Sequence, residues 1–437
     1  MTQSKSTGAT LGAGPEVVSP PNPGALKRDK NFLWLISGAF LSNLGDQFTL
    51  IALPWLVLQT THDSLKLGLV LALIGIPRAV LMLFGGALID RYSPKTVIQC
   101  TKYINALLLA GFAALVYTGH TDFSLIAGFA FVLGISTAFS IPAGPAMMPT
   151  VLAPAQLPAA NAAIMFIRNA CMLAGPLLAG LILWLADQGK ASAELNLTGL
   201  SLAFLFDGLS YAISIWTLEQ VKFLPRPASP ASAVQGVWQQ LQQGLKFCWN
   251  TVPLRHLFMY MAAIAWFAMG PLQVVMPLLA QQLSQSASVL AILAASHGAG
   301  TLLGLLATGL VPRLRVGNLG KTLLSIDMVV ACCFIPMGWL PHSALVALVL
   351  FVVGCLSGYL QVAVYTWIQQ QVPRPLLGRI MSVFMFIFMG IAPLSAGLAG
   401  WLLHYLSLPY MIAAAGVGLL VTVILAFFKS SLIEIHD

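Results

Sequence analysis

Four ionisable residues lie inside long apolar stretches of the sequence, where a charge has to be explained. They are Asp46, Arg78, Arg168 and Asp207. At the centre of a bilayer each such charge costs roughly 2.5–3.5 kcal/mol on insertion scales, so these residues are functional candidates by default. Asp46 is the clearest case, because it lies near the middle of FLSNLGDQFTLIALPW (40–55). A carboxylate there suits proton exchange or contact with a bound molecule, and the alternative is a structural ion pair.

The depth of these residues suggests how they pair. At about 1.5 Å per residue, Asp46 lies roughly 20 Å and Arg78 roughly 15 Å from the same membrane boundary, a gap that an arginine side chain can cover. Burial disfavours a charged carboxylate and a nearby arginine favours it, so an Asp46 that gains and loses Arg78 would take up and release a proton. A permanent pair would only hold helices together. For Asp207 we expect a structural pair with Arg168.

The elements that position these residues must cross a membrane. The chain of 437 residues is 58% hydrophobic and only 8% charged, whereas soluble proteins carry about 25% charged residues. A helix needs about 20 apolar residues to span the bilayer. The fold class that we expect is an all-α polytopic membrane protein with twelve transmembrane helices in two six-helix pseudo-repeats. The predicted spans are 32–58, 66–88, 97–117, 122–149, 160–185, 197–220, 252–280, 288–311, 320–340, 344–370, 379–404 and 409–428.

The basic residues predict the orientation. Most of the 21 Lys and Arg residues fall on the side of the N-terminus, Lys102 among them, and only Lys66 and Lys190 fall on the other side. Because cytoplasmic segments are rich in Lys and Arg, both termini are expected in the cytoplasm of a bacterium, with the protein in its inner membrane. This distribution accounts for the net charge of +8, so no nucleic-acid partner is expected.

The longest segment between two predicted spans separates the first six spans from the last six. We expect a disordered cytoplasmic tail at 1–30, helix bundles at 31–221 and 251–429, a cytoplasmic linker at 222–250 whose second part forms a short amphipathic helix, and a tail at 430–437. The halves resemble each other, since LPAANAA (157–163) precedes AGPLLAGLI (174–182) much as LLGRIMS (376–382) precedes APLSAGLAG (392–400). Such repeats are typical of proteins whose halves rock about a central site.

The loop between the second and third spans carries a specific motif. Gly86, Asp90, Arg91 and Lys95 match the pattern G-x-x-x-D-R-x-x-x-K, which resembles the signature loop of the major facilitator superfamily. The resemblance implies that this loop is a cytoplasmic latch between the halves. Asp90 would then cap the helix that begins near Arg379, since free N–H groups and the helix dipole favour an anion. The alternative is a solvated, positively charged loop.

A second motif lies in the fifth span. Gly175, Pro176 and Gly180 resemble the G-P-x-x-x-G core of the motif that the antiporters of this superfamily carry there. The alternative is ordinary packing, because Gly and Pro are common in membrane helices.

Three features resemble the macrolide-efflux and enterobactin-exporter-like branch of the superfamily. They are GD (45–46) followed by ALP (52–54), PA (142–143) with Pro149 ending the fourth span, and Asn161 opening the fifth.

Methionine and aromatic residues crowd two spans of the second half, as FMYMAAIAWFAM (258–269) and IMSVFMFIFM (380–389). They are either packing residues or an adaptable lining for bulky substrates.

The sequence as a whole predicts a secondary active transporter, a proton-coupled exporter of amphipathic small molecules such as a drug, a siderophore or a lipid-like metabolite. The alternatives are a proton-coupled importer and a non-transporting assembly or sensor protein. We expect no enzyme, metal or cofactor, since neither a G-x-x-x-x-G-K-[ST] loop nor a metal-ligand spacing is present.

Overall fold

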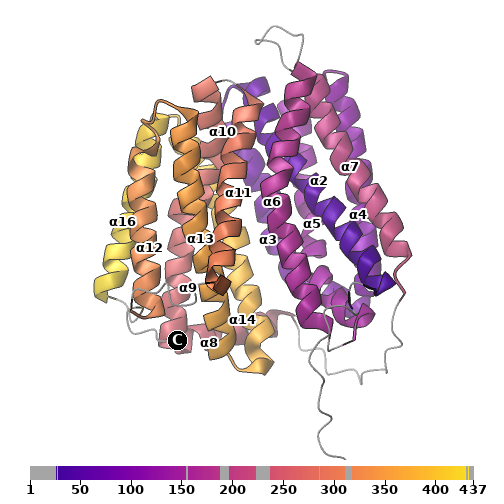
Figure 1. Ribbon diagram of the computed structural model, residues 1–437, viewed down its shortest axis with the longest axis vertical. Coiled ribbons are helices and arrows are strands. Elements are labelled where there is room, and N and C mark those ends of the chain that lie inside the picture. Colours follow the sequence, from indigo (N-terminus) through magenta and orange to yellow (C-terminus); the bar gives the residue numbers. More distant parts are fainter. Residues whose placement is uncertain are drawn as a thin grey trace, which may run out of the picture.

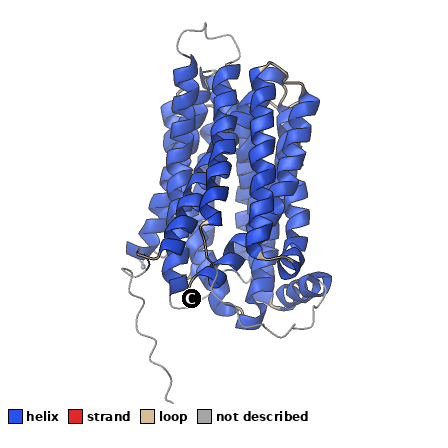
Figure 2. Cartoon of the chain, turned by 90° about the vertical axis from the view of Figure 1, so that its right-hand side faces the viewer, coloured by secondary structure: helices blue, strands red, loops and turns tan. Residues whose placement is uncertain are grey.

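The computed structural model describes residues 26, 28–153, 156–187, 196–222, 237–284, 286–310, 317–429 and 432. Throughout these residues the regular structure is helical and contains no strand. Long helices lie side by side along the long axis of the molecule (Figures 1 and 2). The tails at 1–25 and 433–437, and most of the first part of the linker, fall outside the described residues.

Six helices form the first half of the chain. They are α2 (Lys30–Thr61), α3 (Ser64–Arg91), α4 (Pro94–Tyr117), α5 (Phe123–Val151), α6 (Leu157–Asp187) and α7 (Leu197–Glu219). In Figure 1 they lie on the right of the bundle.

The second half opens with the short α8 (Val237–Asn250), which lies at the lower end in Figure 1, where the sequence predicted a linker helix. Two of its long helices are interrupted by π-helical turns. They are α9 (Val252–Ile264), η2 (Ala265–Met269) and α10 (Gly270–Ser284), and α14 (Arg374–Phe386), η3 (Ile387–Ile391) and α15 (Ala392–Leu402). The others are α11 (Ala287–Leu310), α12 (Leu319–Met337), α13 (Ser343–Gln371) and α16 (Leu408–Lys429).

Eleven helices in the described part of the chain are long and apolar enough to cross a membrane. The helix α2 is not among them, although it is 32 residues long. Its middle carries Asn43, Asp46 and Gln47, which lower its apolar character. Together with α2 the set reaches the twelve predicted spans, and the predicted all-α polytopic class is confirmed.

Local capping explains why the predicted boundaries fall close to the observed ones. Asp63 opens α3 by accepting a hydrogen bond from the amide of Leu65 at 2.8 Å. Ser93 opens α4 in the same way, directly before Pro94 at the first helical position. Such side chains satisfy the free N–H groups of a first turn, so they recur at helix starts.

Both π-helical turns are followed by a proline. Pro271 and Pro393 each follow one of them by two residues, and proline removes an amide donor and clashes with the carbonyl one turn earlier. The backbone relieves the clash by widening the preceding turn. In η2 the carbonyl of Trp266 then accepts a hydrogen bond from the hydroxyl of Ser395 in α15. The sequence analysis did not predict these turns.

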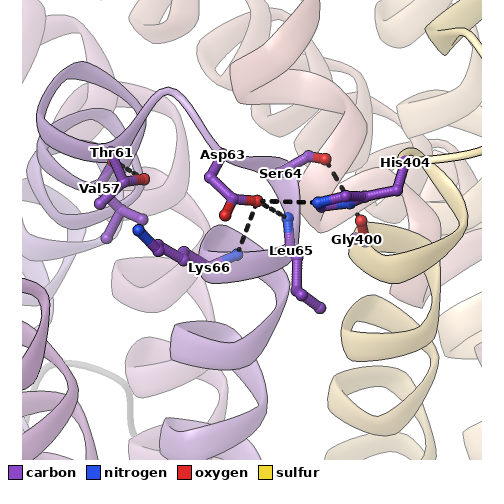
Figure 3. A network of polar contacts seen from close by, with 8 residues as sticks. All are labelled: Val57, Thr61, Asp63, Ser64, Leu65, Lys66, Gly400 and His404. Carbon is purple, nitrogen blue, oxygen red and sulfur yellow. Dashed lines mark hydrogen bonds and ion pairs between the residues drawn. The ribbon is translucent and has the colours of Figure 1, made fainter.

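The two halves meet where α3 packs on α15 and α6 packs on α11. Gly68 of α3 lies against the backbone of Ala396 and Gly400, and a Cβ atom there would collide with them. Near the turn between α2 and α3, Ser64 Oγ donates to the Gly400 carbonyl at 3.3 Å, and His404 Nε2 lies 3.7 Å from Asp63 Oδ1 (Figure 3). We call this end of the bundle the turn end; α8 lies at the other.

Candidate functional site

The carboxylate of Asp46 has a direct hydrogen-bond partner. The hydroxyl of Tyr211, on α7, donates to Asp46 Oδ1 at 2.7 Å. Tyr211 is 7% exposed, whereas Asp46 is partly exposed. Sequence reasoning missed this tyrosine, which is separated from Asp46 by 165 positions.

The contact belongs to a polar interface that we call the α2–α7 seam. On α2 it consists of Gly38, Ser42, Gly45 and Thr49, and on α7 of Asp207, Ser210, Ser214 and Thr217. Spacings of three and four residues put each set on one helix face. Thr49 donates to Asp207 Oδ2, and Ser214 Oγ donates to the Gly38 carbonyl at 2.7 Å. A Cβ atom on Gly45 would collide with Ser210 and Asp207, so the glycine sets the close approach of the helices.

Lys102 of α4 reaches into the seam. Its Nζ donates to Ser42 Oγ at 3.3 Å and to Ser214 Oγ, and it lies 5.8 Å from the centroid of the Tyr211 ring. The predicted distribution of basic residues counts Lys102 on the cytoplasmic side, and the structure shows that its side chain points into the bundle. Because Ser93-Pro94 marks the start of α4, Lys102 lies about 12 Å along the helix, a position that the capping signal could have given.

Arg78 and Arg168 lie near Asp46 without touching it. Both act on its charge electrostatically, as Lys102 does, but no ion pair joins them to a carboxylate within the described residues. The Nε atom of Arg78 is buried without a hydrogen-bond partner. The Asp46–Arg78 pair expected from helix depth is therefore not formed in this conformation.

Asp207 is 2% exposed. It contacts Thr49 and Ser210 in the seam, in place of the Arg168 partner expected from the sequence. Asn105 of α4 lies nearby and is fully buried at 0% exposed, and neither its amide nitrogen nor its amide oxygen has a partner. Buried polar groups of this kind call for an explanation. The Asn105 side chain acts on the hydroxyl of Tyr211, so it belongs to the same polar group of residues as Asp46.

The signature loop is described in part. The backbone of Gly86, Asp90 and Arg91 continues α3, but their side chains lie outside the described residues. Lys95 Nζ donates to the Val221 carbonyl at 3.2 Å, which ties the start of α4 to the end of α7. The guanidinium of Arg379 donates to Gln243 of α8, so the linker helix packs on the start of the eleventh span.

The motif of the fifth span lies at two helix contacts. Gly175 faces the Gln47 side chain of α2, and Gly180 faces Ala291 of α11 in the other half. A Cβ atom at either glycine would collide with these neighbours, while Pro176 lies within the helix between them. The motif thus allows α6 to approach both halves closely, and this geometry fits both interpretations offered above.

The second half offers a different surface. Phe384 stacks near Phe388, Phe258 and Tyr365, with ring centroids 4.7, 6.2 and 6.4 Å from its own. Asp327 is 5% exposed and accepts a hydrogen bond from Tyr260 at 2.7 Å. These residues form an aromatic cluster with one buried acid.

Known proteins resemble the chain along nearly its whole length. It is 26% identical to the multidrug efflux pump Tap of Mycolicibacterium fortuitum, over 92% of this chain and 96% of that protein. It is 25% identical to the enterobactin exporter EntS of Escherichia coli, over 92% of each chain. A solved structure of the nucleoside transporter NupG superposes with a TM-score of 0.73 at 13% identity, covering 91% of this chain and all of that one.

The sequence model of the Major Facilitator Superfamily matches residues 35–397. That range takes in the signature loop, the α2–α7 seam and the contacts between α3 and α15. The protein is accordingly a multi-pass membrane transporter and not an enzyme, and its chain belongs to the Major Facilitator Superfamily.

Proposed function

We propose that the protein is a proton-coupled exporter of amphipathic small molecules, such as a drug, a siderophore or a lipid-like metabolite, that works by alternating access. The observation that carries the proposal is Asp46, a carboxylate in the middle of a membrane helix, bonded to Tyr211 and within electrostatic reach of three cations. Two relatives with full-length similarity bear the names of an efflux pump and an exporter, which favours export over the alternative of import.

In the proposed cycle Asp46 carries the proton. In this structure the carboxylate is bonded to Tyr211 and has no direct arginine partner. Arg78 lies one turn beyond Gly75, which packs on Pro393 of the other half, so in this proposal the change of that contact during rocking repositions the Arg78 side chain relative to Asp46. An approaching arginine favours the charged carboxylate and a receding one favours the protonated form. Proton binding and release thereby follow the motion of the halves.

The proposed substrate site lies between the charged cluster of the first half and the aromatic cluster of the second. Amphipathic molecules suit such a pair of surfaces, because apolar and methionine-rich walls accept varied shapes while polar groups orient one end. The coupling ion is a proton and the surrounding partner is the lipid bilayer.

For orientation we propose that the α8 end faces the cytoplasm, with both termini there, in the inner membrane of a bacterium. The two six-helix halves at 31–221 and 251–429 would then rock about the central site, and Asp90 would close the cytoplasmic side near Arg379. Cysteines at positions 118–121 should react with impermeant thiol reagents from outside, whereas cysteines at 92–96 should not. The reverse pattern would overturn the orientation.

Acridine orange quenching in everted vesicles tests the coupling. Vesicles with the wild-type protein are energised to an acidic interior, and amphipathic compounds are added one at a time. Exchange of a substrate for protons restores the fluorescence, and Asp46→Asn vesicles should show no recovery. Asp90→Asn should lower the recovery rate while the protein still reaches the membrane. Equal recovery in wild-type and Asp46→Asn vesicles would refute proton coupling through Asp46.

A further inference from the structure

Lys102 has an arrangement that the sequence motifs do not explain. A lysine in a membrane helix normally extends toward the nearest interface, where its charge is hydrated. Lys102 instead points into the bundle and is held between hydroxyl groups of two other helices, Ser42 of α2 and Ser214 of α7. Hydroxyl groups supply hydrogen bonds but no countercharge, so its ionic partner must be sought further away.

That partner is Asp46. The ammonium group of Lys102 and the carboxylate of Asp46 attract each other without forming an ion pair. Two structural links join them. Ser42 lies one helical turn before Asp46 on α2, and Tyr211, whose ring lies under the ammonium group, donates its hydroxyl hydrogen to Asp46.

Lys102 also differs from the two arginines in how firmly it is placed. Arg168 is exposed, and the buried Nε atom of Arg78 has no hydrogen-bond partner, so neither arginine has anchors like the two serines that hold Lys102. Lys102 is fixed by Ser42 and Ser214, and these serines lie on helices of the same half as α4. Lys102 is therefore anchored to the same two helices that hold Asp46 and Tyr211, whereas Arg78 lies near a contact with the other half.

We propose that Lys102 is a positioning residue that sets the pH at which Asp46 exchanges its proton. This inference rests on the proposed role of Asp46 as the proton carrier. A fixed cation provides a constant bias toward the charged carboxylate, on which the proposed repositioning of Arg78 is superimposed. The titratable and charged groups around Asp46 are Arg78, Lys102, Arg168, Cys171, Asp207 and Tyr211.

Carbodiimide labelling tests the proposal without knowledge of the substrate. Dicyclohexylcarbodiimide adds to a protonated carboxyl group, whose O–H is consumed as the O-acylisourea forms and rearranges to a stable N-acylurea. The purified full-length protein is labelled in lipid nanodiscs from pH 5 to pH 9, and the label on Asp46 is quantified by peptide mass spectrometry. Labelling in the wild type should fall as the pH rises, and Asp46→Asn supplies the background.

Lys102→Gln removes the cation, so Asp46 should keep its proton to higher pH and the labelling midpoint should rise by about one pH unit or more, as expected for loss of a nearby charge. Lys102→Arg keeps the charge and should restore the wild-type midpoint. Lys66→Gln is the matched control, since Lys66 lies near the turn end over the ring of Phe123, and it should leave the midpoint unchanged. Ser214→Ala removes one of the two hydroxyl groups that hold Lys102 but keeps the lysine charge. It should also raise the labelling midpoint, by less than Lys102→Gln does.

An unchanged midpoint in Lys102→Gln, or a shift of equal size in Lys66→Gln, would overturn the proposal. If Lys102→Gln protein does not reach the membrane, an unchanged midpoint in Ser214→Ala overturns it as well. The result is separable from the proposed function. Vesicles that show no proton exchange would remove the proposed transport cycle, whereas a midpoint that ignores Lys102 would remove only the positioning role.

Discussion

Each half of the molecule contains a carboxylate that accepts a tyrosine hydrogen bond at 2.7 Å, Asp46 from Tyr211 in the first half and Asp327 from Tyr260 in the second. The surroundings of the two pairs differ. Asp46 is partly exposed and three cations act on it, whereas Asp327 is 5% exposed and no cation in the described residues acts on it. The same hydrogen bond can therefore belong to an exchanging site or to a fixed contact, and the neighbouring charges decide which.

The third helix of each half extends the comparison. Lys102 lies eight residues after the start of α4, and Asp327 lies eight residues after the start of α12. Each places a charged group against the first helix of its own half, but the signs are opposite. The first half thus gathers the ionisable groups at its first helix, while the second half has π-helical turns and aromatic rings around its own.

Removing one charge from each half should give the largest contrast. Asp46→Asn keeps the shape of the side chain and should lower pH-gradient-driven transport at least tenfold, because the proposed proton carrier is lost. Asp327→Asn should change the rate by less than about twofold. Transport rates in proteoliposomes with an imposed pH gradient measure both. Retention of uphill transport with an unchanged pH profile in Asp46→Asn would reduce Asp46 to a structural role.

Removing one hydroxyl from each half should separate function from stability. Tyr211→Phe takes the donor from Asp46 and should lower transport about tenfold, since a hydrogen bond to a charged group contributes about 1.5–3 kcal/mol. Tyr260→Phe leaves Asp327 buried without its donor and should destabilise the protein by about 1–3 kcal/mol with transport retained. Thermal unfolding in detergent and transport rates test the two effects. Equal behaviour of the two variants would abolish the distinction between the halves.

An added methyl group tests how tightly the α2–α7 seam is packed compared with an open position in the same half. Gly45→Ala places a Cβ atom against Ser210 and Asp207, and overpacking of this kind costs about 1–3 kcal/mol. Gly111→Ala is the matched control, because a Cβ atom there meets nothing within 4 Å. We expect a lower unfolding temperature for Gly45→Ala and an unchanged unfolding temperature for Gly111→Ala. Similar temperatures would show that the seam adapts to the extra volume.

The smallest effect is expected where the halves meet. His404 and Asp63 have side chains that are 45% and 25% exposed, and exposed ion pairs contribute at most about 1 kcal/mol. His404→Gln should therefore raise the labelling rate of a cysteine at position 72, which is buried against Gly397 further along α3, by no more than about fivefold. A larger increase would make this contact the main closure of the turn end.

The sequence predicted the architecture better than the site. Apolar windows and capping residues are local signals, so the twelve spans and most of their ends could be predicted. Tyr211 and Lys102 were missed because their roles depend on which faces of α2, α4 and α7 meet, and one sequence does not encode those contacts locally. The π-helical turns were missed for a related reason, since η2 relies on Ser395 from another helix to bond the Trp266 carbonyl.

The polarity of α2 has a consequence for how the protein is made. The partners of its seam lie on α7, and Asp46 precedes Tyr211 by 165 residues. At synthesis rates of about 5–20 residues per second, α2 leaves the ribosome roughly 8–33 s before those partners exist. During that interval its hydroxyl and carboxylate groups face lipid or the insertion machinery. The helix α2 thus reaches its final environment only after α7, the last helix of the first half, has been made.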